Sequence, residues 1–198
     1  MKCNGMKVVW CAVLAGELGF LSVQAENVNE QKSDVRGSHC VSEKCAKPVS
    51  PEKENARKAA RERFAADAAV FDRATRREIE RLYRKVSSRS DESAEALKTL
   101  MEKYPKANRT GCAVMYAAQR EKDPAERERL LKLAIASFGD CWYGDGAQVA
   151  PYALWYLAKL YERTGKPDEA KRLFDEIRTD YPNAVTHRGG PFAAWLPK

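Results

Sequence analysis

The residues of this chain best suited to metal chemistry lie close together near its start. The 198-residue sequence contains six cysteines and only two histidines. His39 lies beside Cys40 and near Cys45, which gives two thiols and one imidazole as candidate ligands. Their loose spacing is unlike that of the usual four-ligand zinc motifs. We therefore predict no metal and no cofactor at this position.

A second set of reactive residues lies in the C-terminal third of the sequence. Cys141 and His187, with Asp140 or Asp145, provide the groups of a nucleophilic site. No sequence pattern brings these groups together, and the chain has no phosphate-binding loop or metalloprotease motif. We predict a non-enzymatic protein in which His187 lies at the surface.

The first 25 residues have the features of a signal peptide. Lys2 and Lys7 form a basic start, a largely apolar run follows from Val8 to Val23, and small residues precede Glu26. The charge of Glu17 within the apolar run disfavours the alternative, an uncleaved membrane anchor. We expect an exported protein, periplasmic or secreted, without a stable membrane span after cleavage.

Export changes how the remaining cysteines are interpreted. Cleavage would leave Cys40, Cys45, Cys112 and Cys141, and an even number in an oxidising compartment favours disulfides. Cys112 begins one predicted helix (about 110–121), and Cys141 follows the next (about 124–137). Antiparallel helices of similar length bring those two ends together, so we predict a Cys112–Cys141 disulfide. Whether Cys40 pairs with Cys45 is left open.

Two segments precede the region of regular structure. Residues 26–51 carry almost no large apolar side chains, which predicts a disordered tether. Residues 52–89 contain no glycine or internal proline and predict one long amphipathic helix. The helix carries an apolar stripe formed by Phe64, Ala68, Phe71, Thr75, Ile79, Leu82 and Val86. This stripe packs on the following repeats, at least from Thr75 onward, or pairs between chains as a coiled coil.

The same segment is strongly basic, with 12 Lys and Arg against 7 Asp and Glu in a chain of net charge +7. Such an excess is typical of anionic partners, but interleaved ion pairs on a solvated helix face also explain it. Because we expect export, we predict no nucleic acid partner.

A repeated pattern begins at Ser90 and continues to residue 186. The segments "EALKTLMEKYPKA" (95–107), "RERLLKLAIASFGD" (127–140) and "AKRLFDEIRTDYPNA" (170–184) superpose with steps of 34 and 43 residues. A period of 34 is typical of stacked helix hairpins. The second step contains a nine-residue insertion, in which Gly144 and Gly146 permit a sharp turn.

The segment from 152 to 184 resembles the tetratricopeptide repeat family. The positions that carry the resemblance, and that the family implies pack the two helices together, are Ala158, Tyr161, Gly165, Ala170, Phe174, Ile177 and Pro182. The hairpin at 111–140 matches more loosely, and that at about 76–103 weakly. The resemblance implies an all-α fold, a right-handed array of antiparallel helix hairpins, followed by a tail or short capping helix at 187–198.

The family resemblance also implies a protein-interaction scaffold, here of the cell envelope or the secreted space. Its partner would be a peptide or protein, and we regard Trp142, Tyr143, Asp145 and His187 as possible contact residues. An alternative is a ligand- or carbohydrate-binding protein that uses the turn from Trp142 to Gly146. A third possibility is an oligomeric factor, because the layout is similar to that of the tetratricopeptide proteins of the Tol-Pal envelope system.

Overall fold

The computed structural model describes residues 49–88 and 90–198 of the chain. The predicted signal peptide, the residues His39, Cys40 and Cys45, and almost all of the predicted tether lie outside these residues. The described residues form seven α-helices and one 3₁₀ helix. The elements are α1 (Pro51–Val70), α2 (Arg73–Ser87), α3 (Ser93–Lys103), α4 (Asn108–Arg120), α5 (Pro124–Phe138), α6 (Val149–Arg163), α7 (Pro167–Asp180) and η1 (Phe192–Trp195).

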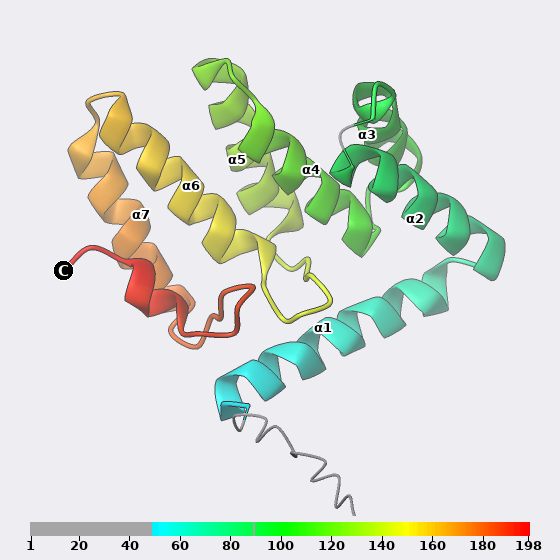
Figure 1. Cartoon of the computed structure of the whole chain (residues 1–198), viewed down its shortest axis with the longest axis horizontal. Coiled ribbons are helices and arrows are strands. Elements are labelled where there is room, and N and C mark those ends of the chain that lie inside the picture. The colour runs from blue at the N-terminus through cyan, green and yellow to red at the C-terminus, as the bar shows by residue number, and fades with distance from the viewer. Residues whose placement is uncertain (1–48, 89) are drawn as a thin grey trace, which may run out of the picture. The chain divides into compact units, whose positions relative to one another are not determined.

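Three antiparallel hairpins, α2–α3, α4–α5 and α6–α7, stack side by side (Figure 1). They bury one continuous apolar core between them, with Leu100, Met115, Leu131 and Leu154 among its fully buried side chains. The predicted all-α array of helix hairpins is therefore confirmed. None of the described helices is long and apolar enough to span a membrane.

Local sequence signals explain where the helices of the second hairpin begin and end. The Asp123 side chain accepts a hydrogen bond from the backbone N–H of Glu126 at 2.9 Å, and Pro124 occupies the first turn of α5. This is the usual N-terminal arrangement, in which a carboxylate satisfies a backbone donor that the helix itself leaves unpaired. α4 is capped differently, by a residue of another helix.

The segment expected to form one long helix is divided into two, so that prediction was wrong. α1 ends at Val70, and Asp72 begins α2 by accepting a hydrogen bond from the Thr75 N–H at 2.7 Å. The predicted apolar stripe changes its environment at this break. Ile79 and Val86 of α2 are buried in the core of the hairpins, whereas Ala68 of α1 is exposed. The second half of the stripe thus packs within the chain.

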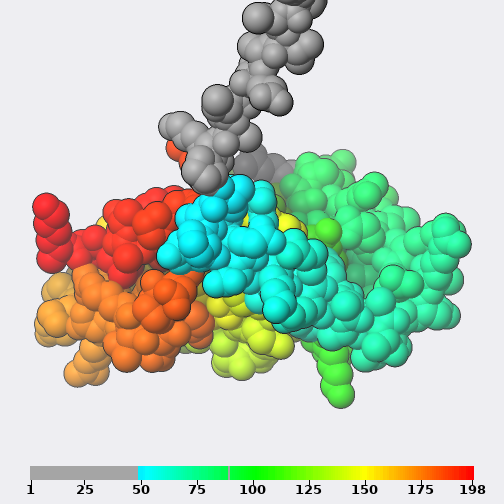
Figure 2. All heavy atoms as spheres, turned by 90° about the horizontal axis from the view of Figure 1, so that it is seen from below, coloured from blue at the N-terminus to red at the C-terminus, as the bar shows by residue number. Residues whose placement is uncertain are grey.

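α1 lies across the ends of the hairpins, where one hairpin passes to the next (Figure 1). Seen from below, it covers the middle of that face, between the C-terminal segments and the first hairpin (Figure 2). Near its C-terminal end, Asp67 accepts a hydrogen bond from the backbone N–H of Asn108 at 2.9 Å. Asp67 therefore caps α4 from outside that helix, and Arg63 holds Asp67 through an ion pair of 2.5 Å.

The N-terminal half of α1 covers two loops that have positive-φ glycines. A Cβ atom added to Gly146 would lie 3.0 Å from the backbone nitrogen of Arg57 and 3.1 Å from the Cβ of Ala56. A Cβ atom on Gly189 would clash with the side chain of Lys53. Along α1, Lys53 lies at the loop after the last hairpin, Arg57 at the loop between the second and third hairpins, and Asp67 at the junction of the first and second. The helix therefore runs along these junctions in the reverse of their order in the sequence.

Candidate functional site

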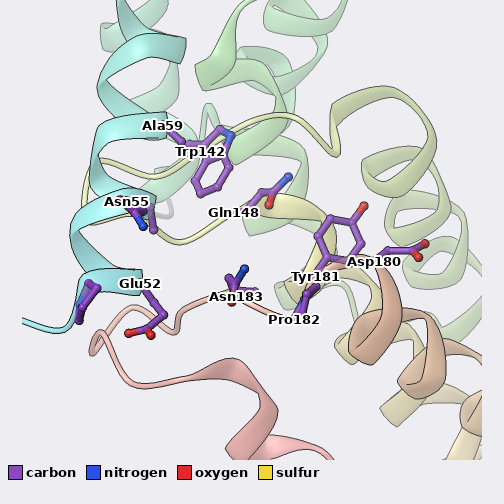
Figure 3. A pocket seen from close by; sticks show the side chains of 12 residues that line it. Glu52, Asn55, Ala59, Trp142, Gln148, Asp180, Tyr181, Pro182 and Asn183 are labelled. Carbon is purple, nitrogen blue, oxygen red and sulfur yellow. The ribbon is translucent and has the colours of Figure 1, made fainter.

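A pocket of 390 Å³ lies where the first turns of α1 meet the loop after α5 and the end of α7 (Figure 3). We call it the α1 pocket. It is lined by Pro51, Glu52, Asn55, Ala56, Ala59, Trp142, Gln148, Asp180, Tyr181, Pro182, Asn183 and Ala184. Three segments distant in sequence therefore build one hollow, and α1 forms a whole wall of it.

The pocket combines two aromatic rings with several carboxamides. Trp142 and Tyr181 provide apolar faces, while the side chains of Asn55, Gln148 and Asn183 lie around the same space (Figure 3). The Gln148 amide donates to the carbonyl of Gly139 at 2.9 Å, which leaves its oxygen as an acceptor. Glu52 and Asp180 add two carboxylates to the lining, and no lysine, arginine or histidine lines the pocket, although the chain carries a net charge of +7. The site suits polar and apolar groups and also a positively charged group.

Trp142 is held in place through its backbone by a buried asparagine. The Trp142 N–H donates to the Asn108 side-chain oxygen at 2.7 Å, and the Asn108 side-chain amide donates to the Trp142 carbonyl at 2.7 Å. Asn108 is completely buried, so this pair of hydrogen bonds is shielded from water. The half-buried indole is consequently presented on a fixed backbone. Sequence reasoning missed Asn108, whose only signal is its position directly after the Tyr-Pro-Lys-Ala segment.

The loop that carries Trp142 is a small hairpin. Trp142 and Gln148 form an isolated antiparallel bridge, and the Tyr143 N–H donates to the Ala147 carbonyl at 2.8 Å. Gly146 has a φ of 97°, which an L-residue with a side chain rarely adopts. Together with the close approach of α1, this conformation explains why a glycine occupies the turn.

The structure brings Asp145 and His187 together, as two of the four predicted contact residues. Their Oδ2 and Nδ1 atoms lie 2.8 Å apart, and about two-fifths of each side chain is exposed. The backbone N–H of His187 donates to the Tyr152 hydroxyl at 2.8 Å, and the His187 ring lies 4.8 Å from the Tyr143 ring. Tyr143 is only 5% exposed, and burial raises its pKa well above the usual value. Tyr143 therefore belongs to the interior rather than to a contact surface.

The nucleophilic site considered from the sequence is assembled only in part. Asp145 and His187 form a pair. The Cys141 sulfur instead contacts the Asp140 carboxylate, at 3.9 Å. Burial, with a further contribution from Asp140, raises the pKa of Cys141 to about 12. The group is therefore a protonated thiol at neutral pH, and a thiol is a poor nucleophile. Among the described residues, no cluster of three potential metal ligands occurs either.

Cys112 and Cys141 lie at the same end of the α4–α5 hairpin. A Cβ atom on Gly111, the neighbour of Cys112, would lie 2.5 Å from the Cys141 sulfur, so the loop after α5 packs tightly on the start of α4. Both cysteines are buried free thiols, and the Cys112 sulfur lies 3.5 Å from the Trp142 carbonyl oxygen. Burial raises the pKa of Cys112 as well. The disulfide between them stays a prediction.

The residues quoted for the repeat pattern lie between α6 and α7 and at the ends of these helices. Ala158, Ala170, Phe174 and Ile177 are at most 2% exposed, and Tyr161 donates a hydrogen bond to the Glu128 carboxylate at 2.9 Å. Gly165 has a φ of 78° at the turn between the two helices, and Pro182 lines the α1 pocket.

Comparison with protein families bears on this last hairpin. A family model described as "Tetratricopeptide repeat" matches residues 152–184. The α6–α7 hairpin is therefore similar to a tetratricopeptide repeat. No curated protein and no solved structure matches the chain. The match covers the repeat whose closing Tyr181 and Pro182 form one wall of the α1 pocket.

Proposed function

We propose that the protein is a non-enzymatic scaffold that binds a segment of a partner protein, with the α1 pocket as the anchor. The observation that carries this proposal is the match to a tetratricopeptide repeat at 152–184, because such repeats typically serve as protein-binding surfaces. The predicted signal peptide supports an exported location, in the cell envelope or the secreted space.

The chemistry of the pocket fits a peptide. A carboxamide can donate to a peptide carbonyl and accept from a peptide N–H, and Asn55 and Asn183 present this group from opposite walls. Trp142 and Tyr181 offer rigid apolar surfaces between them, which suits a side chain of the bound segment. The volume of 390 Å³ lies within the usual range for a small binding pocket.

A photo-crosslinking amino acid at position 55 tests this function in cells that express the full chain. We expect protease-sensitive adducts that disappear when Trp142→Ala is added, identified by mass spectrometry. The control carries the same crosslinker at position 132, an exposed lysine of α5 away from the pocket. Equal adducts at both positions, or adducts at position 55 that persist in Trp142→Ala, would contradict the proposal.

A saccharide is the second candidate ligand, favoured by the combination of an indole face with three carboxamides. A saccharide would contact the α1 pocket rather than the whole turn from Trp142 to Gly146, because Tyr143 and Gly146 are buried. The same crosslinking experiment separates the two candidates. An adduct resistant to proteases and sensitive to glycosidases would favour the saccharide.

A further inference from the structure

α2 presents a basic face at the opposite end of the molecule from α7. Its helical spacing places six basic side chains on the side away from the buried residues Ile79, Leu82 and Val86. The six are Arg73, Arg76, Arg77, Arg81, Arg84 and Lys85. Five of them, all the arginines, are exposed, and α2 belongs to the end hairpin of the array that the described residues form (Figure 1).

The acidic residues near this face have partners, and Asp72 accepts the Thr75 N–H and is further stabilised by the charge of Arg76. Glu80 accepts from Arg109 of α4 at 2.8 Å and from Arg84 at 3.3 Å, so each carboxylate oxygen has a partner. Lys85 pairs with Glu92. Within the part of the chain that the structure describes, Arg73, Arg76, Arg77 and Arg81 form no ion pair.

Several basic residues elsewhere on the surface are paired within their own helix. Arg129 pairs with Glu126, Lys159 with Glu162, and Lys171 with Asp175. Basic residues without an ion pair also occur on other described helices, for example Lys98, Arg163 and Arg172, but α2 carries four of them within nine residues, 73–81.

The side chains of the basic face all belong to α2 and its C-terminal cap. Besides the basic residues they include Glu80 and Ser88 but no aromatic or large aliphatic residue. Residues four apart on a helix lie about 6 Å apart along its axis. Arg73, Arg77 and Arg81 therefore form a row about 12 Å long, with Arg76 beside it.

We infer that the α2 face binds an acidic segment of a partner protein, with carboxylates that match the arginine row. Each guanidinium can bind a carboxylate through two parallel hydrogen bonds. Glutamates four residues apart on a helix repeat at the same distance as the arginines. This surface is separate from the α1 pocket, so the inference holds whether or not that pocket binds a peptide.

Two other anionic partners fit the face less well. A single-stranded nucleic acid is normally held by aromatic stacking in addition to charge, and no aromatic residue lies among these side chains. A helix that lies on a membrane inserts large apolar side chains, whereas the apolar side of α2 is turned into the core. Carboxylates require neither feature.

Fluorescence anisotropy with the full chain tests the inference. The probe is a labelled 15-residue helical peptide with glutamate at every fourth position, and a second peptide has the same composition with its glutamates clustered at one end. The variant Arg73→Gln/Arg77→Gln is compared with Arg172→Gln/Arg188→Gln, which removes the same charge from exposed residues of α7 and the last loop. Exposed ion pairs are individually weak, so we expect about a tenfold loss of affinity for two arginines.

The supporting result is tighter binding of the spaced peptide than of the clustered one, with a tenfold loss in the α2 variant and less than a twofold loss in the control. Circular dichroism should show both variants folded, because the four substituted side chains are exposed. Equal binding of both peptides, or equal losses in both variants, would overturn the inference. So would preferential binding to phosphatidylglycerol vesicles or to a 15-base-pair DNA duplex.

Discussion

Two loops of this molecule, residues 141–149 and 184–192, share one backbone design. They are 43 residues apart, and their hydrogen bonds correspond one to one: Tyr143 N–H to Ala147 and Thr186 N–H to Gly190, each at 2.8 Å. Gly146 and Gly189 take the same positive-φ position, at 97° and 83°. The nine-residue insertion in the sequence is thus a structural unit that the chain uses twice.

The loops differ in what surrounds them. The first joins two full helices, α5 and α6, and its Tyr143 is buried among aromatic side chains. The second follows the last full helix and leads only to the short η1, and the residue equivalent to Tyr143 is Thr186. The same backbone design therefore serves as an interior joint at one place and as the end of the array at the other. α1 packs on both loops.

The largest expected difference lies at the equivalent positions 143 and 186, where a large ring and a small hydroxyl side chain are both buried. Tyr143→Ala would leave a cavity between Tyr116 and His187 and should lower the free energy of unfolding by about 3–5 kcal/mol. Thr186→Ala should cost about 1 kcal/mol, because it removes one hydrogen bond to Gly190. Urea denaturation measures both. Tyr143→Phe is the control and should cost little, since the hydroxyl lies 3.5 Å from its partner, the Cys112 carbonyl. Similar losses for both alanine variants would break the comparison.

Only the first loop can be locked covalently. Cys141 corresponds to Ala184 of the second loop, and Cys112 lies at the end of the same hairpin. If oxidised, the pair would close a 30-residue loop and raise the free energy of unfolding by about 3–4 kcal/mol in the chain-entropy model. Non-reducing peptide mapping of the protein purified from its native source would show the cross-linked peptides, with Cys141→Ser as the control. Free thiols at both positions, or pairing of Cys112 with Cys40 or Cys45, would contradict this prediction.

The glycines should also respond unequally to substitution. Alanine at either position meets an unfavourable φ, which costs roughly 1–2 kcal/mol. At Gly146 the added Cβ also meets the backbone of Arg57 at 3.0 Å, whereas at Gly189 it meets the flexible side chain of Lys53. We expect Gly146→Ala to cost about 2–3 kcal/mol and Gly189→Ala about half as much. Thermal denaturation compares them, and an equal loss would show that α1 does not press more firmly on the first loop.

Alkaline pH should weaken the first loop when its thiols are free. Burial raises the pKa of Cys141 to about 12, from an ordinary value of 9.0. The unfolded chain therefore releases this proton at a lower pH than the folded chain, so stability is retained below pH 9.0 and falls as the pH rises toward 12. The slope is about 1.4 kcal/mol per pH unit for each such thiol. Urea titrations at several pH values should show a shallower slope for Cys141→Ala, and an unchanged slope would contradict the prediction.

The sequence predicted the hairpins well because their signals are local and periodic. Leu131 and Phe174 superpose across a step of 43 residues, the 34-residue period plus the nine-residue insertion, and both are buried. The sequence did not predict the break between α1 and α2 at Phe71, because the apolar spacing continues across it. The one local signal of the break is Asp72, which caps α2. The sequence also did not predict the second loop, because Gly146 and Gly189 share little sequence around them.

The pocket was harder to predict than the repeats because it depends on tertiary contacts. Trp142 was recognised as a contact residue, but its neighbours Asn55 and Tyr181 come from segments far away in the sequence. A partial signal existed in α1: Asp67 is the one charged residue between Ala65 and Ala69. Such a residue in an alanine-rich helix indicates a polar contact, which here is the cap of α4.

The smallest expected effect concerns the bridge between the two loops. Asp145 of the first loop pairs with His187 of the second at 2.8 Å, but both side chains are about two-fifths exposed, so solvent screens the interaction. We expect a coupling of roughly 0.5 kcal/mol in a double-mutant cycle of Asp145→Asn and His187→Gln. Asparagine can still accept the Ala147 N–H that Asp145 holds at 3.1 Å, so the turn itself should persist. A coupling above about 2 kcal/mol would mean that the two loops act as one unit, against the different roles assigned to them here.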